Sequence, residues 1–319
     1  MQVQDVVDEI ASAKQQRKVF FSAALVLIST AAVLPFAAVP LRPLPHVSGI
    51  YAAATAMINL ATFWLLTSAP RQPLSHAVIA AAYLFSGLMA VLHLLTFPGA
   101  LIPDQPVMGS EHAVSALFIV WRAGFAVFIV WAALCEVGSD RGIARQARFP
   151  TVVALAAALF GAIGSQFTDV AATDDHSGQQ FFGLFSLYGS YVAALLAAGA
   201  VALILLRGLH QRAIFVWLIV VLAAEAAGVW LSTFGGARYT LAWYAVRVEG
   251  IIASAWCCSF LHSTSGWCSV AWQMPSTTCN AGPRSCKRPS IDASVQKPSW
   301  LKPKSCVWWA NSALASRTI

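Results

Sequence analysis

The chain has 319 residues, of which 58% are hydrophobic and only 10% are charged. A soluble domain usually carries about 25% charged residues, so this composition excludes an ordinary soluble enzyme or binding module. Several apolar runs exceed the roughly 20 residues needed to cross a hydrocarbon core. The composition therefore predicts an all-α polytopic integral membrane protein.

The net charge of +7 comes mainly from the last part of the chain. Residues 263–319 contain seven Lys and Arg against one Asp, and so hold +6 of that charge. A nucleic-acid partner would rest on this segment alone, and none is expected. Four of the seven Cys residues also lie there, without the CxxC or His spacing of a zinc site. We expect neither a bound metal nor a cofactor.

Apolar runs predict eight membrane spans, at 19–40, 48–68, 74–97, 113–135, 150–168, 181–206, 213–235 and 239–262. Residues 1–18 are expected to form a short cytoplasmic segment. They carry Asp5, Asp8 and Glu9 where a signal peptide would be basic, and the apolar run that follows is too long for a cleaved leader.

Lys and Arg in the short connections between spans indicate the orientation. With a cytoplasmic N-terminus, two of these residues, Arg42 and Arg238, lie outside, and nine lie inside. The nine are Lys14, Arg17, Lys18, Arg71, Arg141, Arg145, Arg148, Arg207 and Arg212. We therefore expect both chain ends in the cytoplasm.

Ionisable side chains inside membrane spans are rare and costly, at about 2.5–3.5 kcal/mol each near the helix centre, so they are functional candidates. The predicted spans contain five prominent ones: His93, Arg122, Glu225, Arg247 and Glu249. His93 lies in the sequence HLLTFPG, near the end of its span. It is either a proton-sensitive or ligand-facing group or a histidine that bonds a carbonyl of a neighbouring helix.

Arg122 lies too deep in its span to reach the membrane surface easily, so it needs a partner or an anionic ligand. Glu225 lies in VVLAAEAAGVWL and is the most isolated charge of the chain. A pair between the two is one possible solution, either as a structural contact or as part of a sensing site. Trp121, next to Arg122, is a candidate for the aromatic lining of such a site.

Arg247 and Glu249 lie two positions apart in the last span, so they point to different faces of the helix. We expect each to contact another helix rather than its neighbour. Tyr239, Trp243 and Tyr244 begin the same span. An aromatic belt at the membrane surface is the favoured interpretation, and Trp243 and Tyr244 are also retained as candidates for lining a site.

The sequence offers little for chemistry. It contains no GxSxG, HExxH or P-loop motif, so no catalytic activity is expected. One outer connection carries carboxylates and a histidine that a divalent metal could use, although a solvated loop is favoured. These residues are Asp169, Asp174, Asp175 and His176.

Three segments together resemble a known family. They are YLFSGLMAVLHLLTFPGAL at 83–101, VWRAGFAVFIVWAAL at 120–134 and ARYTLAWYAVRVEGIIAS at 237–254. Their order and spacing are similar to the fourth type of bacterial membrane-associated sensor domain, over about residues 15–262. The resemblance implies an integral-membrane input module, located in the bacterial inner membrane, that precedes a diguanylate cyclase or histidine kinase region. The chain departs from the family pattern at Arg122, where the resemblance leads us to expect a His.

Residues 263–319 show no pattern, where a sensor domain should continue into a charged helical linker. A change of reading frame explains this composition. With suitable synonymous codons, residues 295–304 read from the third base of the first codon spell Ala-Glu-Ala-Glu-Leu-Ala-Glu-Ala-Lys, a strong helix former. We therefore interpret 263–319 as an irregular, out-of-frame and disordered tail. The alternative is a genuine tail that binds anionic lipid.

The sequence thus predicts a membrane-embedded sensor domain at 19–262 that lacks its output domain and has no catalysis of its own. We expect it to contact the lipid bilayer, to form a homodimer, and to respond to a small molecule or a membrane state. One alternative is a transporter or channel, which would need inverted repeats or broken helices. Another is a membrane enzyme, which would need His93, Glu225 and Glu249 around one cavity.

Overall fold

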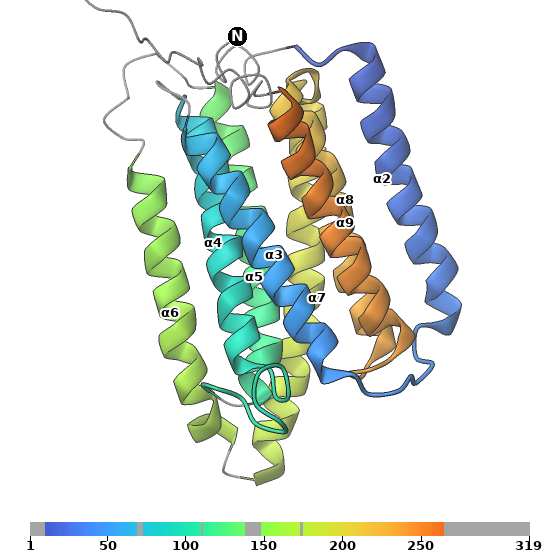
Figure 1. Ribbon diagram of the computed structural model, residues 1–319, viewed down its shortest axis with the longest axis vertical. Coiled ribbons are helices and arrows are strands. Elements are labelled where there is room, and N and C mark those ends of the chain that lie inside the picture. Colours follow the sequence, from blue (N-terminus) through green and yellow to red (C-terminus); the bar gives the residue numbers. More distant parts are fainter. Residues whose placement is uncertain (1–9, 69–72, 110, 138–147, 173–174, 265–319) are drawn as a thin grey trace, which may run out of the picture. The chain divides into compact units, whose positions relative to one another are not determined.

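The computed structural model describes residues 10–68, 73–109, 111–137, 148–172 and 175–264 (Figure 1). These residues form eight long α-helices and no strand. The helices are α2 (Ala13–Val33), α3 (Pro45–Thr67), α4 (Leu74–Thr96), α5 (Glu111–Val137), α6 (Phe149–Ala172), α7 (Asp175–Leu206), α8 (Ala213–Gly235) and α9 (Leu241–Thr264). The predicted tail from residue 265 onward lies outside the described residues.

The all-helical membrane fold is confirmed. Within the described residues, every helix except α9 is long and apolar enough to cross a membrane, which makes seven. The eighth, α9, carries Arg247 and Glu249 in its first half. The helices match the predicted spans one for one, and their ends differ by several residues.

The first helix starts earlier than the predicted span, and the reason is local. Helix α2 begins at Ala13, although the predicted span begins at 19. The Ser12 hydroxyl accepts a hydrogen bond from the Gln15 backbone N–H, and the Gln15 side chain accepts one from the Ser12 backbone N–H. This capping box starts the helix within the segment that the sequence assigned to the cytoplasm.

Consecutive helices run in opposite directions, as membrane spans joined by short connections require (Figure 1). At one end, the start of the chain meets the α7–α8 connection, where the Ala11 N–H donates to the Gln211 carbonyl at 2.6 Å. We call this the basic end, since Arg207 and Arg212 lie there. At the opposite end, the Leu41 N–H donates to the Tyr239 carbonyl at 2.8 Å and joins the α2–α3 and α8–α9 connections.

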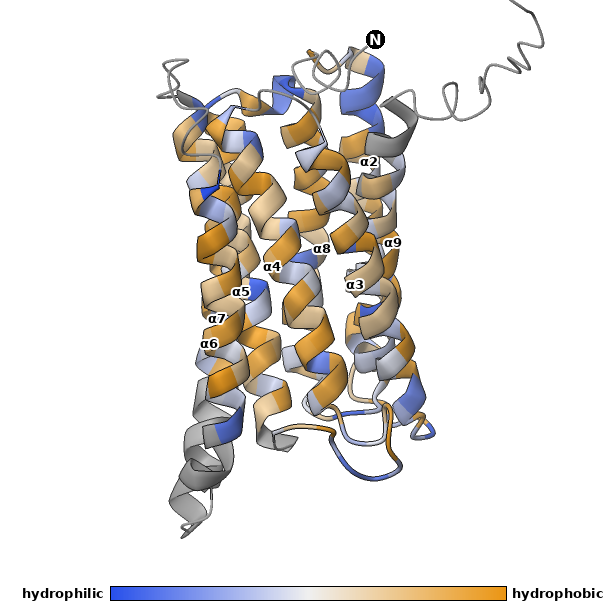
Figure 2. Cartoon of the chain, turned by 60° about the vertical axis from the view of Figure 1, so that its left-hand side comes forward, coloured by the Kyte–Doolittle hydropathy of each residue, from blue (hydrophilic) through white to orange (hydrophobic). Residues whose placement is uncertain are grey.

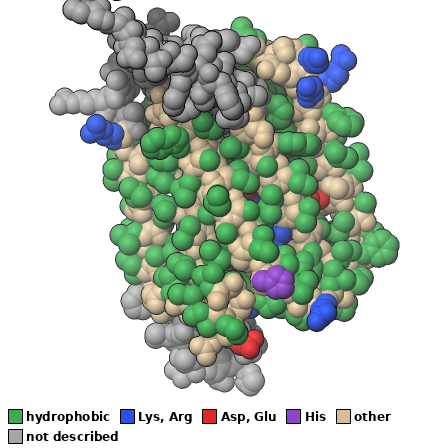
Figure 3. All heavy atoms as spheres, viewed as in Figure 1, with side chains coloured by type: hydrophobic (Ala, Val, Ile, Leu, Met, Phe, Trp, Pro, Cys, Tyr) green, Lys and Arg blue, Asp and Glu red, His purple; other side chains and the backbone are tan. Residues whose placement is uncertain are grey.

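Two central helices hold the bundle together. In the membrane window, 72% of the α4 residues and 78% of the α8 residues are buried, compared with 22% in each of α2 and α6. Helix α4 packs on α3, α5 and α6, while α8 packs on α2, α7 and α9. The described surface is apolar between the two ends (Figures 2 and 3). Exposed side chains such as Phe21, Phe160 and Leu195 occupy the surface that a bilayer would cover.

Gly124 allows α5 to approach α4 closely. A Cβ atom at this position would lie 2.5 Å from the Cε1 atom of Phe85, whose side chain is buried. We expect Gly124→Ala to lower the free energy of unfolding by about 1–3 kcal/mol, because extra volume in a packed core forces side chains out of their rotamers. Thermal unfolding of the detergent-solubilised chain measures this. Gly199→Ala on α7 is the control, because nothing lies within 4 Å of its Cβ position; equal losses in both variants would contradict the prediction.

Candidate functional site

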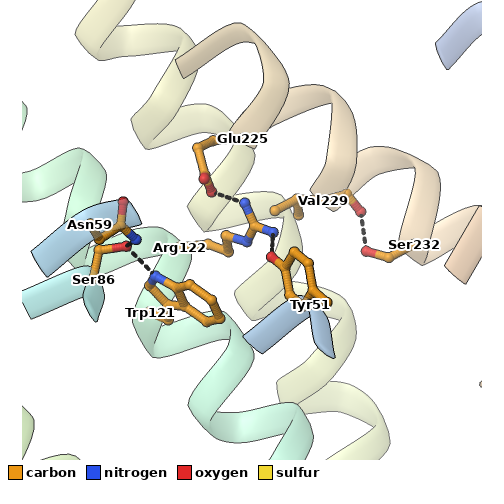
Figure 4. Close-up of polar contacts among 8 residues, drawn as sticks. All are labelled: Tyr51, Asn59, Ser86, Trp121, Arg122, Glu225, Val229 and Ser232. Carbon is orange, nitrogen blue, oxygen red and sulfur yellow. Dashed lines mark hydrogen bonds and ion pairs between the residues drawn. The ribbon is translucent and has the colours of Figure 1, made fainter. Parts of the chain in front are cut away.

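A buried ion pair joins α5 to α8 in the middle of the bundle (Figure 4). The guanidinium of Arg122, 3% exposed, forms a salt bridge with the carboxylate of Glu225. Its Nη2 atom also donates a hydrogen bond to the Tyr51 hydroxyl of α3 at 2.8 Å. The predicted pair between Arg122 and Glu225 is thus present, and it links three helices rather than two.

A second polar group lies beside this pair (Figure 4). The Ser86 hydroxyl of α4 accepts hydrogen bonds from the Trp121 indole N–H at 2.6 Å and from the Asn59 amide at 2.8 Å. All three side chains are buried. Trp121 belongs to α5 and Asn59 to α3, so this group fastens the same part of the bundle through uncharged donors.

A small polar cavity adjoins both groups. Its volume of about 10 Å³ is roughly the space that one water molecule needs. Its polar lining includes Thr55, Asn59, Ser86, Glu225 and Ser254. Neither His93 nor Glu249 lines it. This cavity therefore does not bring His93, Glu225 and Glu249 together, as a membrane enzyme would need.

Arg247 of α9 is buried without a carboxylate partner among the described residues. Its Nη1 atom donates to the carbonyl of Trp243 at 2.7 Å, and its Nη2 atom donates to the Ser48 hydroxyl at 3.4 Å. Its Cζ atom lies 3.3 Å from the ring centroid of Trp243. As predicted, Arg247 does not pair with Glu249.

Glu249 reaches the peripheral helix α2 instead. Its carboxylate accepts hydrogen bonds from the Ser29 hydroxyl at 2.8 Å and from the Thr30 hydroxyl at 3.2 Å. The two hydroxyls satisfy a charge that has no cation partner among the described residues. Together they attach α2 to α9.

We expect the double variant Ser29→Ala/Thr30→Val to destabilise the attachment of α2 by about 1–3 kcal/mol, the cost of leaving a partly buried acceptor without donors. Hydrogen exchange of the α2 amides should become faster while that of α4 stays unchanged. Ser232→Ala is the matched control, because its hydroxyl bonds only the Val229 carbonyl of its own helix at 2.9 Å. Unchanged exchange of α2 in the double variant would contradict this role.

His93 lies in an aromatic pocket near the end of α4. Its ring centroid lies 5.8 Å from Phe97, 6.1 Å from Trp121 and 6.4 Å from Phe118. The side chain is 2% exposed, and neither ring nitrogen has a hydrogen-bond partner among the described residues. The interpretation that a neighbouring carbonyl satisfies this histidine is therefore wrong.

The aromatic residues at the start of α9 have different surroundings. Trp243 is 8% exposed and lies between Arg247 and Tyr239, whose ring centroid is 5.0 Å away. The belt interpretation is therefore wrong for Trp243, because a belt residue faces lipid. The Tyr244 hydroxyl donates to the Arg42 carbonyl at 2.7 Å and so ties α9 to the α2–α3 connection.

A polar cluster at the basic end was not predicted. The Glu136 carboxylate, 4% exposed, forms a salt bridge with Arg212 and accepts a hydrogen bond from Ser75. Sequence reasoning counted Arg212 only as a connection charge and passed over Glu136, the last but one residue of α5. The sequence did show a single acidic residue, Glu136, beside the end of an apolar run, and this could have indicated the cluster.

The acidic outer connection lies outside the described side chains, as do its candidate metal ligands. Among the described residues, no group of three or more His, Cys, Asp or Glu is placed to hold a metal ion.

Comparison with known families agrees with the geometry. A family model described as membrane-associated sensor, integral membrane domain (MASE4), matches residues 44–264. This range contains α3 to α9, and α2 lies before it. Searches of curated proteins and of solved structures find no match. The matched range includes the Arg122–Glu225 pair, His93 and Arg247, and it covers more than half of the chain, so the protein belongs to the MASE4 family of integral-membrane sensor domains.

Proposed function

We propose that this chain is the sensory input domain of a bacterial signal-transduction protein of the histidine kinase or diguanylate cyclase type, located in the inner membrane with its basic end in the cytoplasm. The observation that carries the proposal is the buried contact of Arg122 with both Glu225 and Tyr51. It joins three helices at membrane depth, where a change in one charge alters the packing of all three.

Sensing then works as a shift between two packings of the bundle. A ligand or membrane condition that favours one arrangement of the Arg122 contacts changes how α3 and α8 pack on α9. Helix α9 ends at Thr264, so it is the element that transmits the change to whatever follows. The homodimer expected from the sequence would bring two such helices together.

The proposal includes the segment after α9. We infer that the coding sequence changes frame near residues 262–266, so that 263–319 is an out-of-frame copy of a helical linker. Sequencing the gene from the codon of Trp256 to well beyond that of Ile319 tests this. The shifted frame should stay open and encode a helix followed by a kinase or cyclase domain. A shifted frame that closes within a few codons would show that the tail is genuine.

A reporter fusion tests the sensory role directly. Residues 1–262 are joined through an in-frame helical linker to a diguanylate cyclase domain, and cyclic di-GMP is measured in cells. Glu225→Gln and Tyr51→Phe should change the output, because both alter the contacts of Arg122. Leu195→Ala on the exposed surface of α7 is the control. Equal output from all these fusions at equal expression would reject the sensory role.

The transporter alternative has less support. Each described helix is continuous from its first to its last residue, without the break that many transporter sites use. A flux assay in liposomes separates the two functions, since ligand-dependent transport would favour the transporter.

A further inference from the structure

Arg122 and Arg247 lie close together in the candidate site, and in the described structure only Arg122 contacts a carboxylate. Arg122 and Arg247 both lie against Tyr51, whose hydroxyl bonds Arg122 and whose ring centroid is 5.5 Å from the Cζ atom of Arg247. The only carboxylate that pairs with either of them in the described part of the chain is Glu225, and Arg122 uses it. Among the described residues Arg247 therefore contacts no carboxylate, and Glu249, two positions later, accepts hydrogen bonds from the hydroxyls of α2 instead.

Such a charge is costly to keep. A buried charge without a partner destabilises a protein strongly, and a membrane supplies no water to offset it. The contact with Trp243 offsets part of the cost, because a cation is attracted to the face of an indole ring. The Nε atom of Arg247 still has no hydrogen-bond partner in the described structure. The fold therefore leaves Arg247 incompletely satisfied.

His93 is a second buried side chain whose hydrogen-bonding atoms are unsatisfied in the described part of the chain. It is 2% exposed, and both of its ring nitrogens lack a partner within the described residues. Two guanidinium groups contact the rings around it: the Cζ atom of Arg122 lies 5.4 Å from the ring centroid of Trp121, and that of Arg238 lies 5.5 Å from the ring centroid of Phe97. Phe97 contacts both surroundings, with its ring centroid 5.8 Å from that of His93 and 6.0 Å from that of Trp243, the residue against which Arg247 lies. An unsatisfied imidazole in a strongly positive, aromatic surrounding favours an anion.

We propose that Arg247 and His93 bind the carboxylate group of a small solute. This inference rests on the proposed sensory function and names the chemical class of its signal. The planar guanidinium of Arg247 matches a carboxylate with two parallel hydrogen bonds, and a nitrogen of His93 supplies a third donor. Trp243 and Phe97 provide apolar walls for the rest of the molecule. The one guanidinium without a carboxylate contact in the described structure fits one carboxylate group.

Arg247 and His93 both lie near the end of the bundle opposite the basic end, and a solute would approach them from there. Arg247 lies about two turns after Leu241, where α9 begins, and His93 lies about one turn before Thr96, where α4 ends. Because Arg247 contacts Ser48 of α3, a carboxylate that captures its guanidinium would also break this hydrogen bond between α9 and α3. Binding would thus change the helix packing through which the signal is transmitted.

Thermal unfolding of the purified full chain in an uncharged detergent tests the proposal. The probes are sodium benzoate, its neutral isostere benzamide, and sodium chloride at matched ionic strength. Benzoate should raise the unfolding temperature by several degrees and the other two should not. Arg247→Met should unfold at a higher temperature than the parent without benzoate, and it should not respond to benzoate. Leu195→Ala on the exposed surface of α7 is the control and should respond like the parent.

A second variant guards against a purely structural effect of Arg247. His93→Phe keeps an aromatic ring in the pocket but removes both nitrogens, so it should fold and respond less to benzoate. Equal effects of benzoate and benzamide, or an unstable Arg247→Met that still responds, would overturn the proposal. Stabilisation by added phosphatidylglycerol but not by benzoate, dependent on Arg247, would assign the site to a lipid headgroup and reject the solute. Because no output domain is involved, failure of the reporter fusion would leave this result unaffected.

Discussion

Replacing Glu225 with Gln is expected to lower the free energy of unfolding by about 3–5 kcal/mol, the usual cost of breaking a buried ion pair. The variant leaves Arg122 charged and only 3% exposed, with the Tyr51 hydroxyl and the new Gln amide oxygen as neutral acceptors in place of a carboxylate. Gln has nearly the same shape as Glu, so the loss measures the counter-charge rather than a cavity. The unfolding midpoint of the detergent-solubilised chain gives the value.

The double variant Arg122→Met/Glu225→Leu distinguishes the cost of one uncompensated charge from the contribution of the ion pair as a whole. Replacing both partners with apolar side chains removes the uncompensated charge, so the double variant should be more stable than Glu225→Gln alone. The cyclic di-GMP output of its reporter fusion should nevertheless be fixed at one level, because the contact that responds to a signal is gone. A double variant that is less stable than the single one would contradict this account.

The helices themselves could be predicted from the sequence. Apolar runs of about 20 residues have one solution in a membrane, because every backbone polar group must be satisfied within the helix. The pair between Arg122 and Glu225 could also be anticipated, since two isolated opposite charges at membrane depth need each other. The start of α2 was missed, although the capping box of Ser12 and Gln15 was present in the sequence.

The surroundings of single side chains could not be predicted in the same way. An aromatic residue at a helix start is compatible with a lipid-facing belt, yet Trp243 turns inward because Arg247, four positions later, lies over its ring. The partners of Glu249 are hydroxyls on α2, and Ser and Thr are too common in spans to stand out. These contacts depend on which helix faces meet, and that information is not local.

The hydroxyl of Ser86 is the clearest case of such a contact, and Ser86→Ala should cost about 1–3 kcal/mol for each donor that it leaves unsatisfied. Two donors lose their acceptor, the Trp121 indole N–H and the Asn59 amide, and both side chains are buried. The volume removed is small, so the loss reports unsatisfied hydrogen bonds rather than a cavity. Thermal unfolding measures the cost, and Ser232→Ala, whose hydroxyl bonds only its own helix, should cost far less.

The Trp121→Phe background shows whether the indole N–H is the reason. Phe has no donor to satisfy, so Ser86→Ala should cost less in that background than in the parent, and the two losses should not add. Additive losses would mean that Ser86 acts through packing alone. Because Trp121 precedes Arg122 on α5, a non-additive result would show that a hydrogen bond between uncharged groups fastens this turn of α5 to α4, directly beside the buried cation.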